Sequence, residues 1–291
     1  MKPAPFEYVA PDSLESALEL VARHGSDAKL LAGGQSLIPL LNFRLARPAI
    51  LIDLNRLDDL DFVRPSAAGG LSIGAMTRQS RLEREPLVGQ RAPLLAAAIP
   101  FVAHPQIRNR GTIGGTLAHA DPAAELPAVA VALGARLRLR SRTGERWVDA
   151  ESFFVGLLST ALAPDEILVE IEIPAPSPSP GWSFLEFSRR HGDYALTGIA
   201  AQVVLDDAHR CSEARLVYLS VGDGPVLPSR ACQTLVGEEL RDRQIDEVAE
   251  LIASQEIDPS GDIHASADFK RHLCRVLTRR ALEQCRQRAR P

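Results

Sequence analysis

Two glycine-rich segments contain the residue types and the spacing that could bind a phosphate group. The first lies at 31–37 (LAGGQSL) and the second at 111–117 (GTIGGTL). A glycine pair lets the backbone approach a ligand closely because glycine has no Cβ. Successive backbone N–H groups in such a turn bind anions, and a hydroxyl at Ser36 or Thr112 adds a donor. Two opposed turns of this kind could hold a pyrophosphate from both sides.

Spacing alone leaves a second interpretation open for each segment. A Gly-Gly turn is commonly an ordinary reversal of the chain. Neither segment has the GxGxxG spacing of dinucleotide-binding loops or the GxxxxGK(S/T) spacing of P-loops. On the residues alone, nucleotide binding is therefore one of two interpretations of these turns.

An acidic stretch follows the second segment at 119–127 (HADPAAELP). Asp121 directly precedes Pro122, which predicts that Asp121 is the N-cap of a helix with proline at its first position. Glu125 would lie one turn later, where an acidic side chain suits the helix dipole. The alternative to this structural role is a functional one, in which a carboxylate accepts hydrogen bonds from the hydroxyls of a ribityl chain or a ribose.

No constellation for metal or nucleophilic catalysis is evident. His104 and His119 lack a third ligand for a metal, and no GxSxG turn is present. The cysteines have no CxxC or other tight spacing, so we expect this chain alone to hold neither zinc nor an iron–sulfur cluster. We expect reduced, mostly buried thiols in a cytoplasmic protein. The four cysteines are Cys211, Cys232, Cys274 and Cys285.

Charge and hydropathy narrow the classes of partner. Lys and Arg number 33 and Asp and Glu number 37, a net charge of −4, which argues against a polycationic nucleic-acid-binding protein. No run of 18 apolar residues could form a membrane-spanning helix. The first residues, MKPAPFE, lack the apolar region of a secretory signal. We therefore expect no nucleic acid as a partner and a chain that does not span a membrane.

Helical and strand patterns continue up to a proline-rich linker at 174–181 (PAPSPSPG), and a second set follows it. Residues 12–25 predict an amphipathic helix with Asp12 as its N-cap, and residues 135–140 alternate as in a half-exposed strand. Before the linker, the patterns predict further strands at 28–32, 49–54, 71–75 and 167–173 and helices at 36–45, 91–103 and 128–133. After it, they predict strands at 182–190, 199–205 and 215–221 and helices at 229–237, 242–254 and 266–289.

Four segments occur in an order that resembles a known family. They are AGGQSL at 32–37, QIRNRGTIGGTLAHADPAAELP at 106–127, EILVEIEIP at 166–174 and FSRRHGDYAL at 187–196. Together they resemble the FAD-binding (medium) subunit of molybdenum-containing hydroxylases, the family of carbon monoxide dehydrogenase and xanthine dehydrogenase. The resemblance covers nearly the whole chain. It implies an α+β fold, with a two-part, PCMH-like FAD-binding domain at 1–55 and 56–175 and a smaller α+β domain at 182–291 that contains a three-stranded antiparallel sheet and helices.

The resemblance also implies which residues bind FAD. Residues 32–36 and 112–116 would form the two loops on the pyrophosphate side, with Leu37 against the cofactor. Glu125 is the better of two candidates for a polyol hydroxyl, and Leu168 would hold the flavin through its backbone. The implied set is Ala32, Gly33, Gly34, Gln35, Ser36, Leu37, Thr112, Ile113, Gly114, Gly115, Thr116, Asp121, Glu125, Leu168, Asp193 and Tyr194, of which the last two would lie against the isoalloxazine ring.

Two positions depart from the family's usual residues. Gln35 stands where some members have His or Asn, and Thr116 stands where many have Asn. Both side chains can still form hydrogen bonds, so we expect FAD binding to be retained. No cysteine precedes Cys211, so we expect no additional cysteine-ligated cluster of the kind that some relatives carry.

The implied function is electron transfer without an acid–base residue in this chain. A large molybdenum subunit would hydroxylate the substrate, and a small subunit would pass electrons through [2Fe–2S] clusters to FAD here, and on to NAD⁺, a quinone or O₂. The expected assembly is a dimer of such heterotrimers. One alternative is a self-contained FAD-dependent oxidoreductase with a substrate site in 182–291 and a base such as His191 or Tyr218. Another is a phosphate-binding module without redox function.

Overall fold

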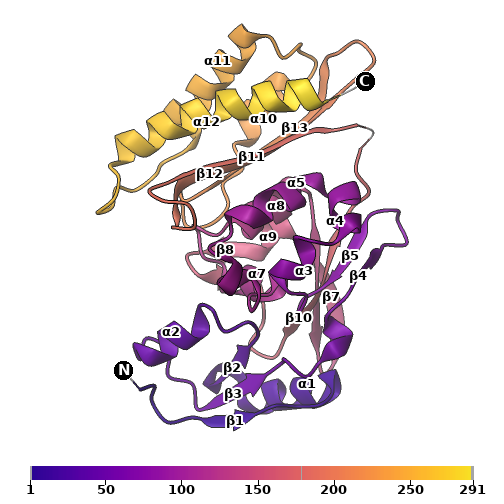
Figure 1. Cartoon of the computed structure of the whole chain (residues 1–291), viewed down its shortest axis with the longest axis vertical. Helices are drawn as coiled ribbons and strands as arrows, with labels where there is room; N and C mark the ends of the chain where they lie inside the picture. The colour runs from indigo at the N-terminus through magenta and orange to yellow at the C-terminus, as the bar shows by residue number, and fades with distance from the viewer. Residues whose placement is uncertain (1, 178, 290–291) are drawn as a thin grey trace.

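The computed structural model describes residues 2–177 and 179–289, and the N-terminal part of these forms a small parallel sheet covered by a helix (Figure 1). The order of its strands is β1 (Glu7–Val9), β3 (Ile50–Asp53) and β2 (Ala28–Leu31). Helix α1 (Leu14–His24) buries its apolar face against this sheet, as the periodicity predicts. A single turn at Gly25–Asp27 and helix α2 (Leu37–Asn42) complete this part of the chain.

The start of α1 corrects one prediction. Ser13, and not Asp12, is the N-cap, because the Ser13 side chain accepts a hydrogen bond from the N–H of Ser16 at 3.2 Å. Either residue type can cap a helix, and the capping-box spacing favoured the wrong one of two neighbours. Asp12 lies on the surface, where it forms an ion pair with Arg56.

A five-stranded antiparallel sheet forms the centre of the molecule. The order of its strands is β4 (Val63–Pro65), β5 (Leu71–Gly74), β10 (Ile167–Ile173), β6 (Arg136–Ser141) and β7 (Gly144–Asp149). Short helices pack on this sheet and enclose the largest apolar core. They are α3 (Gln79–Leu82), α4 (Pro86–Arg91), α5 (Pro93–Ala98), α6 (Pro105–Arg108), α7 (Ile113–His119), α8 (Glu125–Ala132) and α9 (Ala150–Phe153), with single turns at Asp58–Leu60 and Ile99–Phe101 and a hairpin of β8 (Phe154–Gly156) and β9 (Ser159–Thr160).

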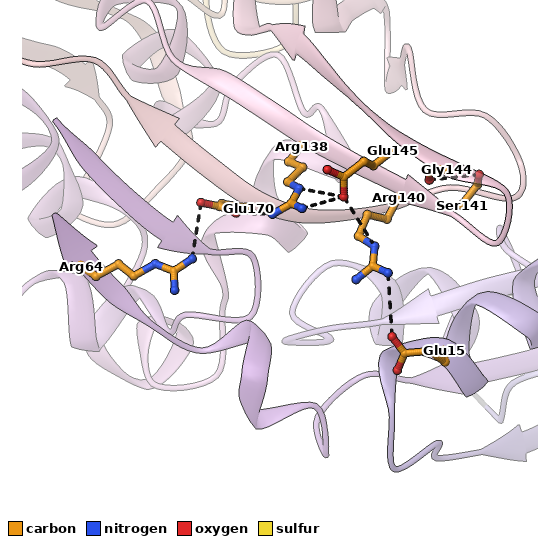
Figure 2. A network of polar contacts seen from close by, with 8 residues as sticks. All are labelled: Glu15, Arg64, Arg138, Arg140, Ser141, Gly144, Glu145 and Glu170. Carbon is orange, nitrogen blue, oxygen red and sulfur yellow. Dashed lines mark hydrogen bonds and ion pairs between the residues drawn. The ribbon is translucent and has the colours of Figure 1, made fainter. Parts of the chain in front are cut away.

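The alternation predicted for β6 is confirmed, and its outward face carries a network of charges (Figure 2). Leu137 and Leu139 point into the core and are fully buried. On the other face, Arg138 bonds Glu170 of β10 at 3.1 Å and Glu145 of β7 at 2.6 Å. Arg140 reaches Glu15 of α1 at 3.8 Å, which connects the N-terminal sheet to the central one. The ion pairs with Glu145 and Glu15 are solvent-exposed, and such pairs stabilise by at most about 1 kcal/mol each. Glu170 is buried and also accepts a hydrogen bond from the Ser72 hydroxyl.

The C-terminal part forms a three-stranded antiparallel sheet between two layers of helices (Figure 1). Its strands are β11 (Gly181–Ser188), β12 (Ala195–Leu205) and β13 (Cys211–Leu219). One face packs against α12 (Ala267–Arg288), which is accompanied by α10 (Ser229–Leu235), α11 (Asp242–Leu251) and a π-helical turn at Ile252–Glu256. The other face packs against α5 and α8, so the two parts of the chain share a buried boundary. The three strands and three helices predicted after the linker are all present.

Candidate functional site

Five separate parts of the chain converge on one cleft of about 220 Å³. The first glycine-rich segment, helix α3, the stretch from 102 to 119 that includes α6 and α7, the acidic stretch and the β11–β12 connection each contribute to its wall. Because the last of these belongs to the C-terminal sheet, the cleft lies between the two main parts of the molecule. The residues around it are Gln35, Ser36, Gln79, Val102, Ala103, Ile107, Gly111, Thr116, His119, Asp121, Ala123, Ala124, Glu125, Gly192, Asp193 and Tyr194.

The first glycine-rich segment has backbone donors with no partner. Within the described part of the chain, the N–H groups of residues 33–36 donate no hydrogen bond. Gly33 lies so close to the second segment that an added Cβ would touch the carbonyl oxygen of Arg110 and lie 2.7 Å from Cα of Gly111. Gly34 has a φ of +75°, which glycine adopts without strain. The segment is thus a turn with free N–H groups, as an anion site requires.

The second segment differs, because its donors are already paired. It begins helix α7, with Thr112 as N-cap accepting a hydrogen bond from Gly115 N–H at 3.1 Å. The N–H of Gly114 donates to Ala75 O at 2.9 Å, and the N–H of Ile113 donates to Thr77 O at 3.1 Å. An added Cβ on Gly114 would lie 2.5 Å from the Cβ of Ala75. These glycines therefore allow close packing of the helix.

A polar bridge connects the two segments, and no sequence motif predicts it. Asn55 Nδ2 donates to Ala32 O at 2.9 Å and to Asp53 Oδ1 at 2.5 Å. Arg78 Nη2 donates to Asn55 Oδ1 at 2.5 Å, and Arg78 Nη1 donates to the carbonyl oxygen of Arg110. Burial and the neighbouring Arg110 lower the pKa of Arg78. Neither arginine has a carboxylate within 4 Å among residues 2–177 and 179–289, so positive charge next to the first segment favours an anion there.

The acidic stretch corrects a second prediction of a helix cap. Helix α8 begins at Glu125 with Ala124 as N-cap, so Asp121 is not the cap. Asp121 instead closes a turn, in which its Oδ1 accepts a hydrogen bond from the N–H of Ala123 at 2.9 Å. Such local side-chain bonds compete with capping and explain why the helix starts later than Pro122 suggests.

Glu125 is the buried acid of the cleft. Its side chain is only 8% exposed, and within the described residues it pairs with no other side chain. Burial raises its pKa to about 7, and the nearby Asp121 contributes to this shift. A hydrogen bond from its own backbone N–H is the one that acts on the carboxyl group within the described residues. The group therefore keeps acceptor capacity for a ligand that brings its own hydrogen-bonding groups.

The C-terminal part contributes the β11–β12 connection to the cleft. Asp193 and Tyr194 both line it, and Tyr194 is largely exposed. Gly192 has a φ of +88°, and an added Cβ there would touch the ring of His104. Phe101 contacts Phe184 of β11 with ring centroids 5.2 Å apart, and it stacks on His191 of the connection, so these contacts hold the connection against the N-terminal side of the boundary.

Leu168 and the two candidate bases named from the sequence do not line the cleft, and neither does Leu37, the first residue of α2. Leu168 pairs with Leu139 inside the central sheet, next to a β-bulge, and its side chain is buried in the large core. Tyr218, a candidate base for a self-contained enzyme, is fully buried in the C-terminal core and bonds Thr278 at 2.5 Å. His191 is exposed and stacks against Phe101. Tyr218 is therefore excluded as a base facing the cleft.

The described residues contain neither a candidate metal site nor a candidate membrane-spanning helix. Among residues 2–177 and 179–289, no three His, Cys, Asp or Glu side chains are grouped to hold a metal ion. Within the same ranges, no helix is both long enough and apolar enough to cross a membrane. The four cysteines are free and buried, as predicted.

The chain matches known protein families and individual proteins along nearly its whole length. Residues 4–176 match the family described as FAD binding domain in molybdopterin dehydrogenase, and residues 182–285 match the CO dehydrogenase flavoprotein C-terminal domain. The chain is 44% identical to subunit alpha of the 6-hydroxypseudooxynicotine dehydrogenase complex of Paenarthrobacter nicotinovorans, over 100% of this chain and 98% of that one. It is 37% identical to the medium chain of carbon monoxide dehydrogenase of Hydrogenophaga pseudoflava, over 97% of both.

Solved structures agree in detail. A chain of carbon monoxide dehydrogenase from Hydrogenophaga pseudoflava superposes with a TM-score of 0.96 at 36% identity, covering 100% of both chains. A chain of quinoline 2-oxidoreductase from Pseudomonas putida 86 superposes with a TM-score of 0.92 at 39% identity, covering 99% of both. The predicted α+β fold with an FAD-binding domain is confirmed. This chain therefore belongs to the FAD-binding medium subunits of the molybdenum hydroxylases, the oxidoreductase family of carbon monoxide dehydrogenase and xanthine dehydrogenase.

Proposed function

We propose that this chain is the electron-transfer subunit of a multi-subunit molybdenum-containing dehydrogenase. It would take electrons from [2Fe–2S] clusters of a small subunit and deliver them to an external acceptor. The observation that carries the proposal is the cleft, which both parts of the chain share and which is lined by the open first glycine-rich segment and by a buried carboxyl group. Arg78 and Arg110 lie behind that segment, next to its backbone.

The residues present fit FAD, judged by what they leave unpaired. The free N–H groups of residues 33–36, with the charges of Arg78 and Arg110, suit a diphosphate. The buried Glu125, which pairs with no other side chain within the described residues, suits a hydroxyl-bearing chain. Bound FAD would supply the redox chemistry, because a flavin can exchange electrons singly with one partner and in pairs with another. The protein's own part is to orient the cofactor and to set the charge around it.

The individual binding residues and the division of the chain belong to this proposal. Residues 32–37 would bind the diphosphate directly, and residues 112–116 would support them from the packed start of α7. Asp193 and Tyr194 would lie on the flavin side of the cleft, and Leu168 would act through its backbone at the β-bulge. The chain would divide into FAD-binding subdomains at 1–55 and 56–175 and a C-terminal domain at 182–291.

The partners follow from the same proposal. A small iron–sulfur subunit and a large molybdenum subunit would complete a heterotrimer, two of which would form a cytoplasmic dimer of heterotrimers. The names of relatives fit such a division of labour, since they include "subunit alpha" and "medium chain" of dehydrogenases named for quite different substrates. Substrate choice would then reside on the large subunit and not on this chain.

Purification of the native complex tests the proposal. We expect the chain to co-purify with an iron–sulfur chain and a molybdenum chain, and substrate to bleach the flavin absorption only when all three are present. The chain purified alone should bind FAD but should not hydroxylate substrate. Hydroxylation by the isolated chain, or a complex without an iron–sulfur chain, would contradict the proposal.

A further inference from the structure

Gln79 is the most conspicuous unexplained group in the cleft. It is the first residue of α3, is only 3% exposed and faces the cleft. Its backbone N–H donates to Gly111 O at 2.9 Å, and its Nε2 donates to Thr116 Oγ1 at 2.9 Å. Its Oε1 is buried and accepts no hydrogen bond from the described part of the chain. Because an unpaired buried acceptor is unfavourable, a donor from a ligand is the expected partner.

The neighbours of Gln79 determine which way its carboxamide points. The Thr116 hydroxyl lies 3.2 Å from Thr112 O, to which it donates, and its oxygen accepts from Gln79 Nε2 in the assigned network. This arrangement places Nε2 toward Thr116 and leaves Oε1 free. An added Cβ on Gly111 would lie 2.5 Å from Oε1 and 2.9 Å from Cδ of Gln79. Glycine at 111 thus provides the room in which this carboxamide sits.

We propose that Gln79 is a cofactor-binding residue that accepts a hydrogen bond from a hydroxyl of FAD, either on the ribityl chain or on the ribose. A diphosphate does not match this atom, since phosphate oxygens are themselves acceptors. The hydroxyls next to the diphosphate do match it, because Gln79 shares the cleft with Ser36 and Gln35 of the first glycine-rich segment. The inference rests on the proposed FAD site and adds a residue to it.

The first test measures FAD affinity of the deflavinated full-length chain by quenching of flavin fluorescence. Gln79→Met removes both polar atoms at similar volume, and we expect FAD to bind about tenfold more weakly. Gln244→Met is the matched control, since Gln244 Oε1 is also buried without a partner but lies on α11, away from the cleft. Affinity should be unchanged in this control. Equal affinity of Gln79→Met and the unaltered chain would overturn the inference.

The second test uses FAD analogues that each lack one hydroxyl of the ribityl chain or the ribose. The unaltered chain should lose about tenfold in affinity for one analogue, and that analogue identifies the hydroxyl. Gln79→Met should not distinguish the same analogue from FAD, whereas Gln79→Glu, which keeps an acceptor, should distinguish it. These comparisons within one variant separate hydrogen bonding from a general loss of structure.

Two results would overturn different parts of the account. If Gln79→Met and the unaltered chain lose the same factor with every analogue, Gln79 does not contact a hydroxyl. If the unaltered chain takes up no FAD, the proposed function itself fails and the inference fails with it. Should Gln79→Met not fold, the discrimination retained or lost by Gln79→Glu decides the question.

Discussion

The two glycine-rich segments look alike in sequence but differ in what their backbones do. In the first, the N–H groups of residues 33–36 have no partner within the described part of the chain. In the second, the N–H groups of residues 113–116 bond inside the protein, and its glycines lie against Ala75 and Ala32. The difference teaches that similar glycine pairs can leave backbone donors free in one turn and allow close helix packing in the next.

The two segments nevertheless form one unit. Gly33 lies against the backbone of residues 110–111, and Asn55 and Arg78 connect Ala32 to Arg110. The packed second segment thus provides a rigid support for the open first one. Changes in the first segment should therefore appear in FAD affinity, and changes in the second should appear in stability.

The largest effect is expected for Gly33→Ala. The added Cβ would meet the backbone of Arg110 and Gly111, which cannot move aside as a side chain can, so the two segments must separate. We expect FAD affinity to fall at least about a hundredfold. Gly89→Ala is the control, since nothing lies within 4 Å of its added Cβ. Fluorescence titration with FAD would reveal the difference, and similar affinities for the two variants would remove the support for a close fit at Gly33.

Gly114→Ala tests the other side of the comparison. Its added Cβ would lie 2.5 Å from Ala75 Cβ and 2.6 Å from Ala75 O. Overpacking of this kind lowers the free energy of unfolding by about 1–3 kcal/mol. Urea unfolding of the FAD-free chain would measure this loss. A variant with unchanged stability but greatly weakened FAD binding would show that the second segment contacts the cofactor directly.

The buried carboxyl group of Glu125 predicts a dependence of stability on pH. Its pKa is raised to about 7 in the folded chain, so between pH 5 and pH 7 the folded state holds a proton that the unfolded state has lost. Stability should therefore fall by about 2 kcal/mol as the pH rises across this window, and Glu125's contribution should level off above it. Burial and Glu125 raise the pKa of Glu186 to about 8, which extends the fall to higher pH.

Glu125→Gln isolates that contribution. The variant carries no titrating group at 125, so its stability should vary less between pH 5 and pH 7 than that of the unaltered chain. Urea unfolding of the FAD-free forms at pH 5, 6 and 7 makes the comparison. Identical pH profiles for both forms would mean that Glu125 is ionised in the folded protein.

Asn55→Ala should have the smallest of these effects. The substitution removes the side-chain amide that donates a hydrogen bond to Ala32 O. It also removes the side-chain oxygen that accepts a hydrogen bond from Arg78. Because the loop loses one bond while its own N–H groups remain, we expect FAD to bind about tenfold more weakly. FAD titration of the variant measures this, and an unchanged affinity would show that the polar bridge does not position the first segment.

Much of the fold could be predicted from local patterns. The alternation in β6 and the three strands after the linker follow from periodicity, which is a property of neighbouring residues. The helix N-caps were harder to predict. Asp12 and Asp121 are residue types that commonly cap helices, but neither is an N-cap in the structure. Strand β1 was not predicted, since three residues on the edge of a parallel sheet show no clear pattern.

Only those residues of the site that belong to a sequence motif could be predicted. The sequence pointed to Ser36, Thr116 and Glu125, and the structure places all three around the cleft. Asn55, Arg78 and Gln79 could not be found in this way, because their roles arise from contacts with residues 23 to 37 positions away. The different roles of the two glycine-rich segments also depend on which N–H groups find partners after folding.

Hydrogen exchange measured by mass spectrometry, with and without FAD, tests the central claim most directly. The account predicts that the amides of residues 33–36 exchange rapidly without FAD and become strongly protected when FAD binds. The amides of residues 113–116 should be protected already and should change little. If FAD binds and residues 33–36 exchange as fast as before, the free donors of the first segment do not hold the cofactor and the account is contradicted.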